Sequence, residues 1–269
     1  MLNRLFLLTR ALFPVLAVLI AGSDLPVAHA SILYSSGFET PTFTTGPIAG
    51  QDGWNVFGPG NPIVDNFFSD TGTQAVFVDG NEASQTGPYH TDVTTGPIVD
   101  LSSDIAIFTS TTQTEWQFAG LDPTLTQFLG GIDILPDDAI VALTAGSPVI
   151  GAFPRATGFD STAWHSIDLL FNLSSQTYSI SLDGATLASN LAFCGDSAGC
   201  AGASVSSYGG GLFDTNGISS PGVGASGSIP NDSGYMDNFQ VADVGVPEPS
   251  TILLLGLGLA GAACRLRRR

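Results

Sequence analysis

The sequence has 269 residues, enough for one sizeable domain or two small ones. Acidic residues outnumber lysine and arginine by 24 to 7, and the formal net charge is −17. Between residues 31 and 245 the only lysine or arginine is Arg155, so this span carries a formal charge of −21. Each phosphate contact needs a cation to neutralise it, so the composition excludes nucleic-acid binding. Divalent cations and a neutral polysaccharide are compatible partners.

The first 30 residues have the pattern of a secretory signal peptide. Arg4 and Arg10 supply positive charge, residues 11–21 are almost wholly apolar, and Ala28-His29-Ala30 is an A-x-A cleavage site. Cleavage there leaves Ser31 as the mature N-terminus, after export by the Sec machinery. The alternative, a permanent membrane anchor, is disfavoured because the apolar run is short for a span.

Residues 31–245 are predicted to form one all-β domain, because short apolar runs alternate with turn-forming residues and no internal repeat is visible. The clearest strands cover residues 164–171 and 176–183, joined by a hairpin loop at 172–175. The other strand candidates are Ala75–Val78, Ile105–Thr109, Thr114–Phe118, Gly131–Leu135, Ala139–Leu143 and Tyr235–Val241.

A Gly/Ser-rich segment, residues 195–234, contains 11 glycines and 9 serines. A strand is expected around Ser204 to Phe213, with the rest a mobile surface loop. The alternative is a binding rim that uses Tyr208 and Phe213.

Five residues separate Cys194 from Cys200 in the sequence CGDSAGC. In an exported protein such a pair most simply forms a local disulfide, which stabilises the fold by roughly 2 kcal/mol. A metal-binding pair is the alternative, although no second Cys or His pair is near in sequence.

Three stretches of the body resemble the concanavalin A-like, laminin-G-like jelly rolls of exported bacterial proteins. They are Gly37-Phe38-Glu39 with Gly50 to Trp54, the hairpin from Trp164 to Gly184, and Gly234 to Val241. The resemblance implies a jelly-roll β-sandwich. It implies no single activity, because this sandwich hosts lectins, adhesins, glycosidases and structural modules.

No catalytic residue is predicted. Glycoside hydrolysis needs two carboxyl groups about 5–9 Å apart, and the Glu-x-Asp-x-x-Glu motif of the glucanases with this fold is missing. Ile132-Asp133-Ile134 is similar to its centre but has no flanking Glu. His90 is expected in a loop, His165 on a strand, and the tryptophans in the core.

No cofactor is required by the sequence, but a structural calcium ion is a candidate. Glu39 near the first strand and Asp237 in the last strand offer hard oxygen ligands. The terminal strands of these sandwiches lie side by side, so one ion would bring the chain ends together. The alternative is that both carboxylates are solvated or hydrogen-bonded.

The C-terminal tail has a second apolar run, the 15 uncharged residues 250–264. As a helix it would span roughly 22 Å, less than a hydrocarbon core of about 30 Å. The four arginines that follow would stay in the cytoplasm, so that the acidic domain faces outward. They are Arg265, Arg267, Arg268 and Arg269.

Residues 246–269, which begin Val246-Pro247-Glu248-Pro249, resemble the PEP-CTERM sorting signal of Gram-negative bacteria. The resemblance implies transient insertion in the inner membrane, cleavage near the Pro-Glu-Pro box by an exosortase, and delivery to the cell surface or exopolysaccharide matrix. The alternative is an anchor that is never cut. The sequence therefore predicts a non-catalytic surface or matrix protein, structural or carbohydrate-binding, with a glycan-active hydrolase or lyase as the alternative.

Overall fold

The computed structural model describes residues 30–80, 85–108, 114–135, 139–145, 160–196, 202, 204–218 and 232–245. The predicted signal peptide up to residue 29 and the predicted sorting signal at 246–269 lie outside these ranges. Within them, no helix is long and apolar enough to cross a membrane.

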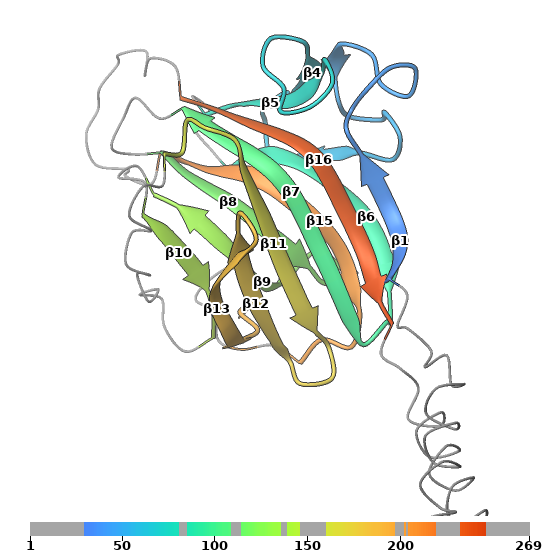
Figure 1. The fold of residues 1–269 in the computed structure, drawn as a ribbon, viewed down its shortest axis with the longest axis vertical. Helices are drawn as coiled ribbons and strands as arrows, with labels where there is room; N and C mark the ends of the chain where they lie inside the picture. The colour runs from blue at the N-terminus through green and yellow to red at the C-terminus, as the bar shows by residue number, and fades with distance from the viewer. Residues whose placement is uncertain are drawn as a thin grey trace, which may run out of the picture. The chain divides into compact units, whose positions relative to one another are not determined.

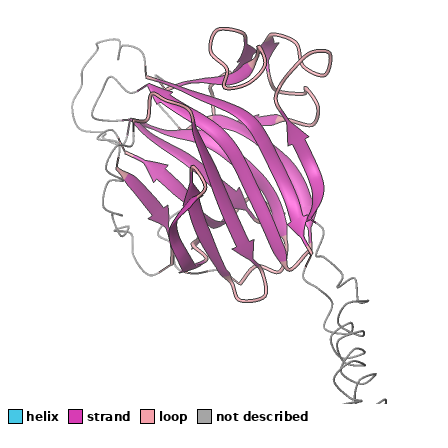
Figure 2. Ribbon diagram, in the orientation of Figure 1, coloured by secondary structure: helices cyan, strands magenta, loops and turns pink. Residues whose placement is uncertain are grey.

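The described chain forms two antiparallel sheets that pack face to face (Figure 1). Figure 2 shows only strands and loops in these ranges. The predicted all-β jelly-roll sandwich is therefore confirmed.

The nine-stranded sheet has the order β13-β12-β11-β7-β16-β5-β4-β2, and β1 pairs with the free part of β16. The bounds, in this order and ending with β1, are Ala185–Ala192, Thr177–Leu182, His165–Asn172, Ile98–Phe108, Ser233–Val244, Ala75–Asp79, Ile63–Asp65, Gly46–Pro47 and Ala30–Ser36.

The seven-stranded sheet has the order β10-β9-β8-β15-β6-β3, and β14 pairs with β9. In this order, ending with β14, the strands are Ile140–Leu143, Gln127–Ile134, Thr114–Leu121, Tyr208–Ile218, Gly87–Thr94, Asn55–Phe57 and Gly195–Asp196.

The core fills the space between the two sheets. In the predicted hairpin of β11 and β12, Phe171 pairs with Tyr178, and both side chains are buried. Trp54 and Trp116 are also fully buried, which confirms their prediction as core residues. For Trp164 the prediction is wrong, because it is only half-buried and stacks on Phe68 with the ring centroids 5.0 Å apart. Burial of each large side chain contributes about 2–3 kcal/mol relative to exposure.

Several strands differ from the prediction, and β7 and β6 are the clearest cases. β7 begins at Ile98 rather than Ile105, because its first half places polar residues such as Asp100 outward and Val99 inward. β6 was not predicted, and His90 lies in it rather than in a loop. Its start, Gly87, permits close strand packing, because a Cβ there would lie 2.4 Å from the Asp214 Cβ.

The Gly/Ser-rich segment contributes the central strand β15, which starts at Tyr208 rather than Ser204. Tyr208 and Phe213 are fully buried, so the binding rim proposed for them is wrong. Three glycines, 209–211, let this strand pass under large neighbours; a Cβ on Gly211 would lie 2.8 Å from the Phe239 ring. The expected mobile loop falls largely on residues 219–231, outside the described ranges.

Candidate functional site

A groove of about 490 Å³ opens on the outer face of the seven-stranded sheet. This volume lies within the range of ordinary ligand pockets. Successive side chains on a strand point to opposite faces, so Phe213 enters the core while its neighbour Leu212 faces outward into the groove. The groove is lined mainly by Phe57, Gln85, Tyr89, Leu121, Phe128 and Leu212.

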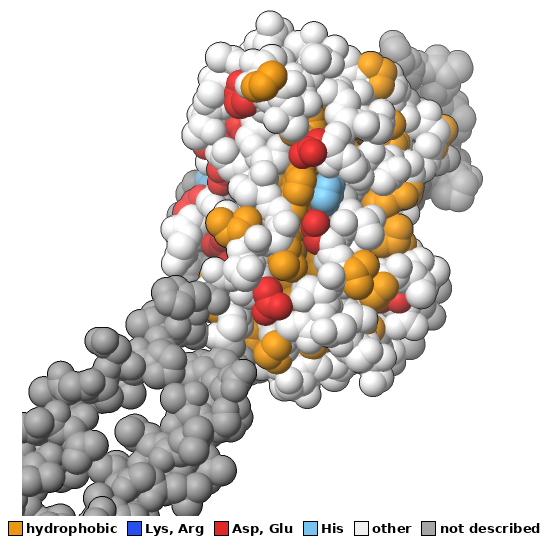
Figure 3. All heavy atoms as spheres, turned by 90° about the vertical axis from the view of Figure 1, so that its right-hand side faces the viewer, with side chains coloured by type: hydrophobic (Ala, Val, Ile, Leu, Met, Phe, Trp, Pro, Cys, Tyr) orange, Lys and Arg blue, Asp and Glu red, His pale blue; other side chains and the backbone are white. Residues whose placement is uncertain are grey.

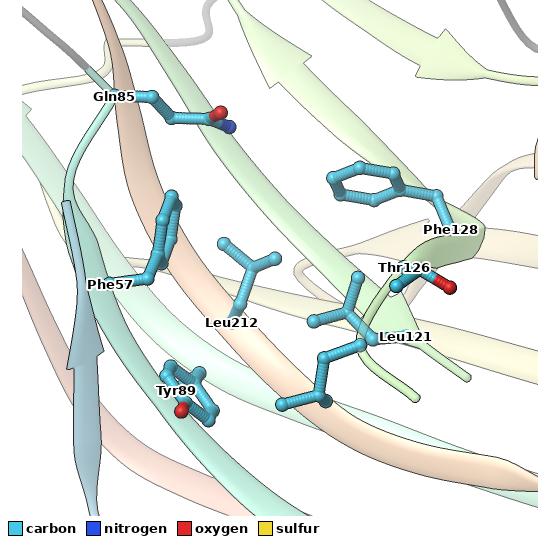
Figure 4. Close-up of a pocket in the computed structure, with 8 residues that line it drawn as sticks. Phe57, Gln85, Tyr89, Leu121, Thr126, Phe128 and Leu212 are labelled. Atoms are coloured by element: carbon cyan, nitrogen blue, oxygen red, sulfur yellow. The ribbon is translucent and has the colours of Figure 1, made fainter. Parts of the chain in front are cut away.

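Aromatic rings form the walls of the groove (Figure 4). Phe57 and Tyr89 lie on one side, Phe128 lies on the other, and Leu212 lies between them. Leu212 belongs to an apolar cluster separate from the main core. The rings come from three different strands, so they offer rigid apolar surfaces for a ligand with flat apolar faces.

A row of polar side chains runs across the same outer face beside the groove. Gln117 on β8 is in register with Asp214 on β15 and with Asp133 on β9. Gln117 Nε2 donates to Asp133 Oδ1 at 3.0 Å, and Gln85 Nε2 donates to Asp214 Oδ2 at 2.6 Å. Gln85 therefore connects the polar row to the groove.

Both carboxyl groups of this row are buried, and neither faces a lysine or arginine among the residues that the structure describes. Burial raises the pKa of Asp133 to about 7. The hydrogen bond from Gln117 acts in the opposite direction and lowers the pKa, whereas the negative charge of Glu115 raises it by a smaller amount. Burial also raises the pKa of Asp214 well above its usual value; Gln85 opposes this shift, and Asp133 adds to it. Asp214 therefore holds a proton more tightly than an ordinary carboxyl group does.

The two carboxyl groups of the row lie on different strands. Asp133 and Asp214 share a face, but one strand separates them, so their Cα atoms lie about 10 Å apart. Asp214 has no exposed surface, so it touches no ligand in this conformation.

The groove is also poorly suited to an anionic ligand. The ranges that the structure describes contain neither lysine nor arginine. Figure 3 shows acidic side chains and a histidine, but no lysine or arginine, on the face that it presents. A carboxylate-bearing sugar in the groove would therefore have no described side-chain cation to pair with.

Glu39 and Asp237 are brought to the same loop, residues 70–74. Glu39 accepts backbone hydrogen bonds from Thr73 and Gln74 at 2.6 and 2.8 Å. Asp237 accepts backbone hydrogen bonds from Asp70 and Thr71, both at 3.1 Å. The expected pairing of the terminal strands is present, since β1 runs antiparallel to β16.

The two carboxylates respond differently to these contacts. Burial raises the pKa of Glu39, but the hydrogen bonds from Thr73 and Gln74 outweigh it, and the net pKa is lowered. Burial raises the pKa of Asp237 to about 6 despite three backbone hydrogen bonds. Among the described residues, no group of three or more His, Cys, Asp or Glu is placed to hold a metal ion.

The calcium hypothesis stays a prediction. Millimolar calcium should raise the Tm of the protein, because saturation to 100 times the Kd adds about 2.7 kcal/mol of apparent stability. Thermal scans with calcium, with chelator, and with sodium chloride at matched ionic strength measure this. Asp237→Ala should abolish most of the shift. An equal shift in sodium chloride, or an unchanged response in Asp237→Ala, would show that the two carboxylates are only hydrogen-bonded or solvated.

Cys194 is buried and disulfide-bonded. Cys200 lies outside the described ranges, so the pairing with Cys200 stays a prediction.

The two described histidines both bond to aspartates. His90 Nδ1 lies 2.7 Å from Asp92, and its ring stacks on Tyr34 with the centroids 3.7 Å apart. His165 Nδ1, at the start of β11, lies 2.8 Å from Asp183 in the turn between β12 and β13. These contacts assign both histidines to packing and turn stabilisation.

Sequence reasoning missed the groove entirely. Its aromatic residues are separated by long stretches of sequence, and each is an ordinary strand residue by itself. An available signal was the outward position of apolar residues beside core residues, as in the pair Leu212 and Phe213.

Residues 245–269 match the PEP-CTERM protein-sorting motif. The predicted sorting signal is confirmed. The motif indicates an exported protein that is briefly anchored in a membrane before cleavage. No curated protein matches this chain in sequence.

Solved structures share the fold of the body. A carbohydrate esterase, vb_24B_21 from the Shiga toxin-encoding bacteriophage phi24B, is similar over 81% of this chain and 100% of its own, with 14% identity and a TM-score of 0.53. The cellulose-induced protein Cip1 is similar over 79% of this chain and 98% of its own, with 15% identity and a TM-score of 0.50.

A sialidase is similar over 73% of this chain, with 11% identity and a TM-score of 0.52, but this chain spans only 17% of the sialidase's length. At these identities the likenesses show the fold alone.

Proposed function

We propose that the protein is an exosortase-processed protein of the Gram-negative cell surface or exopolysaccharide matrix, and that its groove binds a neutral glycan without cleaving it. The observation that carries the proposal is the groove on the outer face of an acidic domain. Three aromatic side chains line its two sides, and polar side chains lie at one end. The sorting motif supports the address, since it indicates an exported protein.

The chemistry of the groove supports a neutral sugar. Pyranose rings have apolar C–H faces and a rim of hydroxyl groups, and Phe57, Tyr89 and Phe128 offer surfaces for the faces. Gln85 and Thr126 offer hydrogen-bonding groups for the rim. A uronate polymer would add carboxylates to a domain that already repels anions.

Binding is tested by calorimetric titration of the protein with cellohexaose, xylohexaose, laminarihexaose and an alginate hexasaccharide. At least one neutral hexasaccharide should bind, and the alginate should not. Tyr89→Ala should weaken binding about tenfold, because removal of a stacking aromatic costs about 1–2 kcal/mol.

Phe67→Ala is the matched control, because Phe67 is an aromatic residue 85% exposed outside the groove. It should leave the affinity unchanged. Equal loss in both variants, or tight binding of the alginate, would contradict the assignment of the groove.

The same samples test the alternative, a glycan hydrolase or lyase. New reducing ends would reveal hydrolysis, and new unsaturated ends would reveal elimination. Either activity, if lost in Tyr89→Ala and kept in Phe67→Ala, would replace binding by catalysis as the function of the groove.

A further inference from the structure

The polar row beside the groove contains two buried acceptor atoms that no hydrogen bond satisfies. They are Asp214 Oδ1 and Gln117 Oε1. Asp214 is fully buried and Gln117 is 5% exposed, so bulk water does not satisfy them. A buried acceptor without a donor loses the free energy of a hydrogen bond, so this pair requires an explanation.

A single proton would satisfy both atoms. Asp214 and Gln117 are in register on adjacent strands, and their side chains share the outer face. If Asp214 is a carboxylic acid, its hydroxyl can donate to Gln117 Oε1. The hydrogen bonds would then run in one direction, from Gln85 to Asp214, to Gln117, and to Asp133.

The surroundings favour a proton over a cation. Within the described ranges, Asp133 and Glu115 are the charged groups that raise the pKa values in this row, and both are acidic. A calcium ion would need six to eight oxygen ligands. The row supplies few, and the described residues contain no metal-binding cluster of three.

We propose that Asp214 is a neutral carboxylic acid that positions Gln85, and that Gln85 is the specificity-determining acceptor for a hydroxyl group of the glycan. The second half rests on the proposed function of the groove. One N–H of Gln85 Nε2 donates to Asp214 Oδ2, and this bond fixes the orientation of the amide, whose Oε1 can then accept a hydrogen bond from the ligand. Gln85 lines the groove and lies at one end of it in Figure 4.

This arrangement defines the ligand class more narrowly. An acceptor at the end of an apolar groove selects a sugar with a free hydroxyl there. At Oε1 it discriminates against a methyl ether and against a carboxylate, since neither has a proton to donate to this oxygen.

The protonation state is tested in the full chain by infrared spectroscopy at about pH 8.5, where ordinary carboxyl groups are ionised. A carbonyl band of a protonated carboxylic acid should be present in the wild type and absent in Asp214→Asn. A band that appears only after chelation of calcium would show that a cation occupies the row, and its complete absence would show an ionised Asp214. Both results would overturn the proposal.

The positioning role is tested by the affinities for the neutral hexasaccharides and their per-O-methylated forms. The wild type should prefer the free sugar about tenfold, and Gln85→Ala should lose this preference. Asp214→Asn should keep it, because the amide can donate to Gln117 and accept from Gln85. Asp214→Leu should lose it.

Equal preference in the wild type and Gln85→Ala would overturn the role of Gln85. The infrared band without any glycan binding would overturn the groove's function while leaving the neutral Asp214 in place. The two failures are thus distinguishable.

Discussion

The protein is expected to be more stable at about pH 5 than at about pH 8. Burial raises the pKa of Asp133 to about 7, and it raises the pKa values of Asp100 and Asp237 to about 6. A carboxyl group with a raised pKa binds its proton more tightly in the folded state than in the unfolded state. Its stabilisation is complete below about pH 4 and is lost as the pH rises through 6 to 7.

Groups with lowered pKa values act at lower pH. The net pKa values of Glu39 and Asp122 are lowered, because hydrogen bonds to each carboxylate outweigh its burial. Their stabilisation is present above their unfolded pKa near 4 and is lost only below it. The change in stability between about pH 5 and pH 8 is therefore controlled by the carboxyl groups whose pKa values are raised.

Asp133 should contribute a large part of this effect, together with Asp214, whose raised pKa acts over the same pH window. The rise of the Asp133 pKa from 3.8 to about 7 corresponds to at most about 4 kcal/mol. Urea unfolding at several pH values and constant ionic strength measures the free energy of unfolding. Asp133→Asn should flatten the dependence between pH 5 and pH 8 by a large fraction.

Asp160→Asn is the matched control, because hydrogen bonds from Thr162 lower the pKa of this exposed carboxyl. It should leave the slope from pH 5 to pH 8 unchanged. High sodium chloride separates the general repulsion among surface carboxylates, which it screens, from the buried group, which it screens little. Stability that is constant or rises from pH 5 to pH 8 would show that the buried carboxyls are not protonated there.

Replacement of Pro247-Glu248-Pro249 by three alanines should leave the protein uncut in the inner membrane. The motif places a polar recognition box before an apolar run and a basic end, and processing depends on the box. Cell fractionation and intact mass measure the outcome. Nearly all of the chain should keep its tail, whereas the wild type should appear outside the membrane at a lower mass.

Three alanines at residues 226–228, far from the tail in sequence, provide the control and should be processed normally. A second variant, with Arg267, Arg268 and Arg269 replaced by glutamine, should weaken retention and orientation of the precursor. Normal mass and yield of the surface form after loss of the Pro-Glu-Pro box would refute exosortase processing.

Local patterns predicted the elements whose signal lies within a short stretch. The hairpin of β11 and β12 was predicted because apolar residues alternate on both strands around a turn. The first half of β7 was not predicted, because the polar residues between Asp100 and Asp104 are typical of a loop. On a sheet with one face in water, the same residues simply occupy the outward positions.

The sequence by itself determined the export and sorting signal, the all-β class and the strongly acidic charge. These follow from composition and from motifs contiguous in the chain. Only the tertiary structure decided the groove and the row of Gln85, Asp214, Gln117 and Asp133. Their residues meet because strands distant in sequence pair in one register, and a shift of one residue would turn each side chain to the opposite face. Burial, and with it the raised pKa values, exists only once that register has formed.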